Sequence, residues 1–355
     1  MENSKSKKRK GFIFYFLLII SIIALFKVIA TIDKIDDQPI LKYLINSDGN
    51  SYRVVGCFNA DGSEIIIPET YKNLPVIAID DYAFHKENIV SITLPSTIVS
   101  IGEGAFAECP SLKAVYGLEY CKELQQLPKY VFAICTALED IKLPPNLVYI
   151  GECAFIGCDI TTIEFPSTLK NIDYGAFVSC VSLSKVTFPD GIENISCSFA
   201  QCSSLTDITI PSSVTNLHPG AFNGCINIKN IYVDENNMNF SSIDGIVYSK
   251  SKDVLWSYPS GRVDKHFSIS SNIRVLAGSC FGHTSLESIY VPKSVTYIET
   301  QAFFFSPNLT RINYEGTVSE WLAIEKAWDW DEDASDFTIY CTDGTIAKNG
   351  TVTYN

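Results

Sequence analysis

The dipeptide Ala-Phe returns along this chain at intervals of about 22 or 23 residues, and this period constrains the fold more than any other feature. Three variants, Val131-Phe132, Ser198-Phe199 and Cys280-Phe281, fill gaps in the series, so nine phenylalanines fall in one column. A fixed period in the twenties predicts a solenoid of about nine coils, in which each coil covers the apolar face of its neighbour. The regular copies are Ala83-Phe84, Ala105-Phe106, Ala154-Phe155, Ala176-Phe177, Ala221-Phe222 and Ala302-Phe303.

Each repeat also contains a short run of the form Ile-x-Leu-Pro, as at Ile92-Thr93-Leu94-Pro95. Alternating apolar residues predict a strand with its apolar side chains inward, and the proline ends the strand because it cannot donate to a continuing ladder. We expect Ala-Phe on a short helical or turn segment on the opposite wall. The predicted fold class is therefore an α/β repeat solenoid with short parallel strands.

Two parts of the chain depart from this repeat. Between Phe222 and Phe281 the series is interrupted, and the runs Ile243–Tyr248 and Val254–Pro259 predict a β-hairpin that protrudes from the stack. Each end of a solenoid needs a cover for its core and its strand edge. We expect a β-rich N-terminal cap at 41–82, repeats at 83–315 with the hairpin insertion at about 236–270, and a C-terminal cap at 316–355.

The N-terminus has the pattern of a membrane signal. Residues 1–10 are basic, and residues 11–32 are apolar over enough length to span a bilayer as a helix. Because cations stay on the cytoplasmic side, we expect a cytoplasmic tail at 1–10, a transmembrane signal anchor at 11–32 and a linker at 33–40, with the repeats outside the cell. The alternative is a signal peptide cleaved near Ala30, which would give a secreted protein.

The charge balance argues against one class of partner. The net charge is −13, and the basic N-terminal segment conceals a still more acidic remainder. Because nucleic-acid binding depends on neutralising phosphates, we expect no nucleic-acid partner. Membrane contact is expected through the N-terminal span only.

The repeat unit resembles that of the BspA-like leucine-rich repeats, Leu-Pro-x-x-Leu-x-x-Ile-x-x-x-Ala-Phe-x-x-Cys-x-x-Leu. The resemblance covers roughly residues 41–345 and extends to Leu74-Pro75-Val76 before the first Ala-Phe and to Tyr314–Thr317 after the last. It implies a right-handed coil of the leucine-rich-repeat kind and a cell-surface or secreted protein associated with adhesion. The family has no shared catalytic residues to transfer.

The cysteines do not indicate a metal site. Six of the twelve share one column, three residues after the phenylalanine, and we expect them to be buried as small apolar side chains. Zinc needs ligands that converge on one point, and a row of stacked thiols does not do so. Pairing of Cys153 with Cys158, or of Cys197 with Cys202, remains an alternative. The column contains Cys109, Cys135, Cys158, Cys180, Cys202 and Cys225.

No other motif indicates catalysis. The acidic run at 329–333 lacks the glycine and the glutamate of a calcium loop, since Ala334 and Tyr340 stand in their places. No Ser/His/Asp or Cys/His grouping and no glycine-rich phosphate loop has motif spacing. We expect no enzyme activity, no cofactor and no metal, and the alternative is an unrecognised enzyme site in the C-terminal cap.

The outward residues of the strands form the best candidate binding surface, because stacked coils align them into a broad sheet. We predict a non-catalytic protein that binds a host or matrix protein, or a glycan, on this face. An envelope scaffold for proteins of the same cell is the alternative. Exposed aromatic residues commonly anchor interfaces, which favours the tyrosines and the tryptophan of the hairpin. The candidate residues are Asp140, Lys142, Glu164, Lys185, Asp207, Asn230, Tyr232, Tyr290, Arg311 and Trp256.

Overall fold

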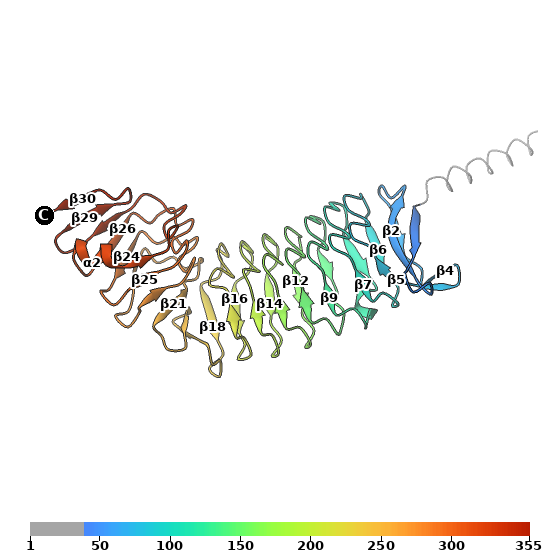
Figure 1. Ribbon diagram of the computed structural model, residues 1–355, viewed down its shortest axis with the longest axis horizontal. Helices are drawn as coiled ribbons and strands as arrows, with labels where there is room; N and C mark the ends of the chain where they lie inside the picture. Colours follow the sequence, from blue (N-terminus) through green and yellow to red (C-terminus); the bar gives the residue numbers. More distant parts are fainter. Residues whose placement is uncertain (1–38) are drawn as a thin grey trace, which may run out of the picture.

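The computed structural model describes residues 39–355, which form an elongated parallel β-solenoid (Figure 1). The predicted tail at 1–10, the span at 11–32 and most of the linker at 33–40 lie outside the described residues. Among residues 39–355, no helix has both the length and the apolar character that crossing a bilayer requires.

The Ile-x-Leu-Pro runs form a set of parallel strands along one wall of the solenoid, here called the first ladder. Its strands pair in register along the stack, as Thr162, Ile163 and Glu164 do with Lys185, Val186 and Thr187. The bounds are β3 (Glu64–Ile66), β6 (Ser91–Thr93), β8 (Ala114–Tyr116), β10 (Asp140–Ile141), β12 (Thr162–Glu164), β14 (Lys185–Thr187), β16 (Asp207–Ile210), β18 (Asn230–Val233), β22 (His266–Ser268), β24 (Ser288–Val291), β26 (Arg311–Tyr314) and β28 (Thr338–Tyr340).

A second ladder follows the proline turn in each coil. Its strands are mostly two residues long and end in a buried aliphatic side chain, such as Ile150 and Ile172. The bounds are β5 (Leu74–Ile79), β7 (Ser100–Ile101), β9 (Gln126–Leu127), β11 (Tyr149–Ile150), β13 (Asn171–Ile172), β15 (Asn194–Ile195), β17 (Asn216–Leu217), β21 (Val254–Ser257), β23 (Val275–Leu276), β25 (Tyr297–Ile298) and β27 (Glu325–Lys326).

The third wall of each coil is a turn that contains Ala-Phe. It is not helical: in most coils left-handed residues stand two before and two after the phenylalanine, as Tyr130 (φ 59°) and Ile134 (φ 58°) do around Phe132, and in the coils of Phe199 and Phe222 only the later position is left-handed. A residue in the left-handed region cannot continue a right-handed helix, so each turn ends after a few residues. Calling the fold α/β is therefore imprecise, because the described residues contain almost no helix.

Consecutive turns are held together by backbone hydrogen bonds and by aromatic stacking. Phe132 N–H donates to the carbonyl oxygen of Ala154 at 2.8 Å, and equivalent bonds recur along the wall. The rings stack nearly parallel, with centroids of Phe155 and Phe177 5.1 Å apart and those of Phe177 and Phe199 also 5.1 Å apart. Ala176, which precedes Phe177, is fully buried.

The aromatic column is longer than the phenylalanine series predicts. Tyr258 occupies the same position, since its N–H donates to the Cys280 carbonyl and its ring lies 5.6 Å from that of Phe281. Trp330 follows Phe303 at 5.8 Å. The estimate of about nine coils is therefore too low, because Tyr258 replaces the phenylalanine in one coil and Trp330 packs edge-on against Phe303 from a further coil.

The expected hairpin is packed into the stack and does not protrude. Strands β19 (Phe240–Ile243) and β20 (Ile246–Ser249) pair antiparallel, and β20 also pairs with β21, which places them in the second ladder's sheet. The side chain of Val247 belongs to the core of the preceding coils, whereas Ile246 and Tyr248 belong to that of the following coils. The hairpin therefore separates two hydrophobic cores.

The two ends of the described chain carry antiparallel strands. β1 (Ile40–Ile45) pairs with β2 (Tyr52–Phe58), β4 (Thr70–Tyr71) pairs with β5, and β29 (Gly344–Ala347) pairs with both β28 and β30 (Val352–Tyr354). The helical pieces are η1 (Leu118–Tyr120) and α2 (Val318–Ala323), and Thr317 and Glu320 cap the start of α2 with reciprocal hydrogen bonds.

The cysteine column does more than fill space. Each of the six thiols donates to the carbonyl oxygen of the phenylalanine one coil earlier, as Cys180 Sγ does to Phe155 at 3.1 Å. Ser306 has the same role in a later coil, donating to Phe281 at 2.6 Å. All twelve cysteines are free. The expectation that these thiols act only as small apolar side chains is therefore incomplete, because each buried thiol also donates to a backbone carbonyl oxygen.

We expect Phe177→Ala to destabilise the protein by about 3–5 kcal/mol, because it opens a cavity between the rings of Phe155 and Phe199 and removes one stacking partner from each. Val181→Ala is the matched control, since Val181 lies in the same coil but is exposed. Urea unfolding followed by tryptophan fluorescence measures both. Equal urea midpoints for the two variants would contradict the proposed contribution of the aromatic column to stability.

We expect Cys180→Ala to lower stability by about 1–2 kcal/mol and Cys180→Ser to lower it less, because serine keeps the donor to Phe155. Burial also raises the pKa of the Cys180 thiol well above its usual range. The stability that this thiol contributes is therefore fully present below about pH 9. Above that pH it decreases, by roughly 1 kcal/mol at pH 10, because the thiol ionises in the unfolded chain but stays neutral in the folded one.

Thermal melting between pH 7 and pH 10 tests both the order of stability of the two Cys180 variants and the loss of stability at high pH. Cys180→Ser should lose less stability on going to pH 10 than the unaltered protein does, because a hydroxyl does not ionise there. An alanine variant as stable as the serine variant would show that the thiol hydrogen bond contributes nothing.

Candidate binding face on the first ladder

The outward side of the first ladder, here called the strand face, consists of the residues that flank each buried strand residue. In β12 the side chain of Ile163 is buried, whereas Thr162 and Glu164 on either side are exposed. Because the strands pair in register, equivalent outward residues of successive coils lie in two columns. The strand face is therefore an array of side chains supported by four hydrogen-bonded groups of strands, β3 to β10, β12 with β14, β16 with β18, and β22 to β28.

The structure brings nine of the ten predicted residues onto this face. Eight are exposed and Asn230 is half-buried. Asp207 of β16 is in register with Asn230 of β18, and Thr209 is in register with Tyr232. The exposed residues are Asp140, Lys142, Glu164, Lys185, Asp207, Tyr232, Tyr290 and Arg311.

Trp256 lies elsewhere, in β21 of the second ladder. Its ring packs against both hydrophobic cores and lies 5.0 Å from the ring of Phe240. Its indole N–H donates to the carbonyl oxygen of Leu217 at 3.0 Å. Trp256 therefore joins the hairpin to the preceding coil and does not lie on the strand face.

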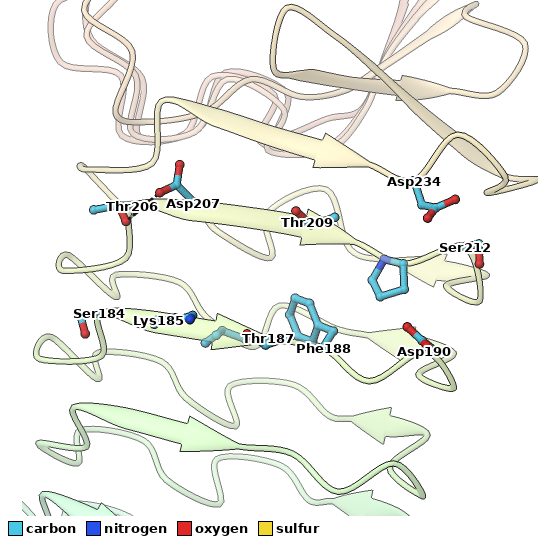
Figure 2. Close-up of a pocket in the computed structure, with 12 residues that line it drawn as sticks. Ser184, Lys185, Thr187, Phe188, Asp190, Thr206, Asp207, Thr209, Ser212 and Asp234 are labelled. Atoms are coloured by element: carbon cyan, nitrogen blue, oxygen red, sulfur yellow. Dashed lines mark hydrogen bonds between the residues drawn. The ribbon is translucent and has the colours of Figure 1, made fainter.

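The strand face is hollowed between coils. One hollow of about 470 Å³ lies over β14 and β16, and Figure 2 shows Lys185 and Asp207 toward one end of the strands and Asp190 and Asp234 toward the other. Phe188 is buried and lies in the middle of this view. Two further hollows, of about 390 and 500 Å³, lie beside it along β10, β12 and β14.

Carboxylates, lysines and threonines make up half or more of the lining of each of these three hollows, and apolar strand residues make up most of the remainder. Neither Lys142 nor Lys185 forms an ion pair with another residue among 39–355. Exposed charges with no fixed partner are well hydrated and can exchange water for the charges of a partner molecule.

A fourth hollow, here called the C-terminal hollow, has a different lining. It measures about 590 Å³ and contains Tyr290, Arg311 and Tyr340 together with Val291 and Pro292. The guanidinium carbon of Arg311 lies 3.6 Å from the centre of the Tyr340 ring. Its Nε donates to Asn313 Oδ1 at 2.6 Å. This hollow combines aromatic surface with a cation held in one position.

Two exposed tyrosines of the strand face escape the sequence prediction. Tyr340 shares one register column with Tyr290 and Asn313, and Tyr116 is in register with Thr93. Tyr116 was hidden because Gly117 replaces the proline that marks other strands, and Tyr340 because its strand lies in the segment assigned to a cap. Both tyrosines could have been identified as the outward third residue of a strand.

The acidic run at 329–333 packs against the preceding coil. Gln301 Nε2 donates to Glu332 at 2.8 Å, Thr300 donates to Asp329, and Trp330 continues the aromatic column. Within residues 39–355, no cluster of three or more histidine, cysteine or acidic side chains has an arrangement that could hold a metal ion.

The turn wall opposite the strand face has one hollow of about 590 Å³ at the junction of the two cores. Asn223 Nδ2 crosses this junction to the carbonyl oxygen of Ser279 at 3.1 Å. Outside the hollow, the N–H of Gly261 donates to the carbonyl oxygen of Ile228, and a Cβ at Gly261 would come within 2.5 Å of that oxygen. The residues that line this hollow join the two halves of the solenoid.

Comparison with known proteins gives one family and several similar structures. The family model described as BspA type leucine rich repeat region matches residues 77–127, 125–253 and 264–322, in six copies. No curated protein matches the chain.

Three solved structures share the fold at low sequence identity. A leucine-rich cell surface protein of Faecalibacterium prausnitzii is 23% identical with a TM-score of 0.63, and the match covers 82% of this chain and 98% of that one. A leucine-rich repeat protein of Bacteroides ovatus is 24% identical with a TM-score of 0.60, over 85% of this chain and 77% of that one. The pneumococcal vaccine antigen PcpA is 21% identical with a TM-score of 0.52, over 79% and 82%.

Proposed function

The chain belongs to the BspA-type leucine-rich repeat family, and from this premise we propose that it is a non-catalytic binding protein of the cell surface that uses its strand face for adhesion or recognition. The observation that carries the proposal is the strand face itself. Its strands are paired in register within each of its sheets, and it presents unpaired charges and exposed tyrosines over many coils. Solenoids commonly use such extended surfaces for partners.

The proposed partner is a host or matrix protein or a glycan. Tyr232 and Tyr290 supply large apolar contact area at a small entropic cost, which favours them as anchors. Asp140, Lys142, Glu164 and Lys185 surround neighbouring hollows and supply the charges that select a partner.

The organisation of the chain completes the proposal. Residues 11–32 anchor the protein in the membrane, with 1–10 in the cytoplasm and the repeats outside the cell. The segments 41–82 and 316–355 act as caps that cover the ends of the solenoid. The hairpin insertion at about 236–270 joins its two cores.

We expect the purified full-length protein to capture host or matrix components, and Tyr232→Ala or Tyr290→Ala to weaken capture by about tenfold or more, as loss of an interface anchor does. Surface plasmon resonance against matrix proteins, a glycan array and extracts of the same cell's envelope measures this. Tyr174→Ala is the matched control, since Tyr174 is equally exposed but lines the hollow of the opposite wall.

Capture of envelope proteins alone would favour a scaffold of the same cell. Unchanged affinity of both tyrosine variants, with a loss in Tyr174→Ala, would move the binding surface to the turn wall.

A further inference from the structure

The C-terminal hollow differs from the other hollows of the strand face in having a preorganised cation beside exposed aromatic rings. We propose that this hollow binds a sugar residue that carries a carboxylate, such as a uronic or sialic acid unit of a glycan. The inference rests on the proposed function, because it names the ligand class of one part of the strand face.

The first argument is the state of Arg311. Its guanidinium is stacked on Tyr340, and only its Nε is engaged, by Asn313. Among residues 39–355, no carboxylate pairs with Arg311 and neither Nη has a hydrogen-bond partner. A planar fork held in this way favours a bidentate carboxylate, and stacking has already removed much of its rotamer freedom.

The second argument is the aromatic surface. Tyr290 and Tyr340 stand on either side of Asn313 in one register column, so their Cα atoms are about 10 Å apart, two strand spacings. Tyr290 is 51% exposed and its ring has no aromatic or cationic partner among the described residues. An open ring face beside the fork offers a surface against which the apolar face of a pyranose can pack.

The third argument is the polar lining. Ser271, Thr342 and Glu315 line the hollow, and its volume of about 590 Å³ lies in the range of small-ligand sites. Hydroxyl and carboxylate groups can donate to or accept from sugar hydroxyls. Arg311 is the one cation of this lining and Glu315 its one acidic residue, so the hollow can pair with a single carboxylate and offers no further cation to a heavily sulfated chain.

The backbone argues against an extended peptide in the same place. Strands β24, β26 and β28 pair with one another across the floor of the hollow. Their backbone groups are therefore engaged, and a peptide finds no strand edge to extend. A sugar needs only side-chain contacts.

The test uses the full-length protein and three pairs of probes in isothermal titration calorimetry. The first two pairs are sialyllactose with lactose, and a glucuronate-containing tetrasaccharide with its carboxyl-reduced form. They distinguish the two sources of the carboxylate. The third pair is a short peptide with a free C-terminus and the same peptide amidated. We expect at least one carboxylated sugar to bind about tenfold or more tightly than its uncharged partner.

We expect Arg311→Lys to weaken that binding by at least about tenfold, since lysine keeps the charge and loses the fork. Tyr290→Ala should weaken it similarly. Lys122→Ala is the control, because it removes an exposed cation that lines none of the hollows of the strand face. Unchanged urea midpoints show that the variants fold.

Equal binding of the charged and uncharged sugars, or binding of the peptide alone, overturns the inference. Binding of none of the probes also overturns the inference. If the protein then still captures matrix components, and Arg311→Lys does so with unchanged affinity, the proposed function stands without the sugar site. Conversely, sugar binding that is abolished in Arg311→Lys, with no surface partner captured, supports the inference and counts against adhesion.

Discussion

The spacing between coils depends on the hydrogen bonds and ring stacking that join successive Ala-Phe turns. Phe132 N–H reaches the next turn at 2.8 Å, and the rings of the column keep separations of 5.1 to 5.8 Å along each core. This spacing is slightly wider than the roughly 4.8 Å between neighbouring parallel strands on the other two walls. The thiol column adds a third link, because each cysteine bonds to the phenylalanine carbonyl of the coil before it.

The packed hairpin shows what happens where that column is broken. Between Phe222 and Tyr258 no ring contact continues the stack, and the hydrophobic core divides in two. Trp256, Asn223 and Gly261 replace stacking with hydrogen bonds and close backbone approach across the junction. The strand face on either side consequently belongs to two bodies of coils, and its aromatic C-terminal hollow lies in the second.

Local pattern predicted most of the strand face. An inward residue at Ile163 places Thr162 and Glu164 outward whatever the neighbouring coils contain, and nine of the ten candidates lie where this alternation puts them. Trp256 lies apart because its strand belongs to the second ladder, and strand alternation alone does not say which ladder a strand joins. Tyr116 and Tyr340 were missed where the proline marker or the repeat assignment failed.

The sequence by itself determined the solenoid, the inward and outward sides of its strands and the position of the aromatic column, because each of these follows from periodicity within one repeat. Tertiary structure alone decided that the Ala-Phe segment is a turn between left-handed residues, that the thiols are hydrogen-bonded, and that Tyr290, Arg311 and Tyr340 share one hollow. Those features arise from contacts between neighbouring coils, and the coils' spacing and register exist only after they have stacked.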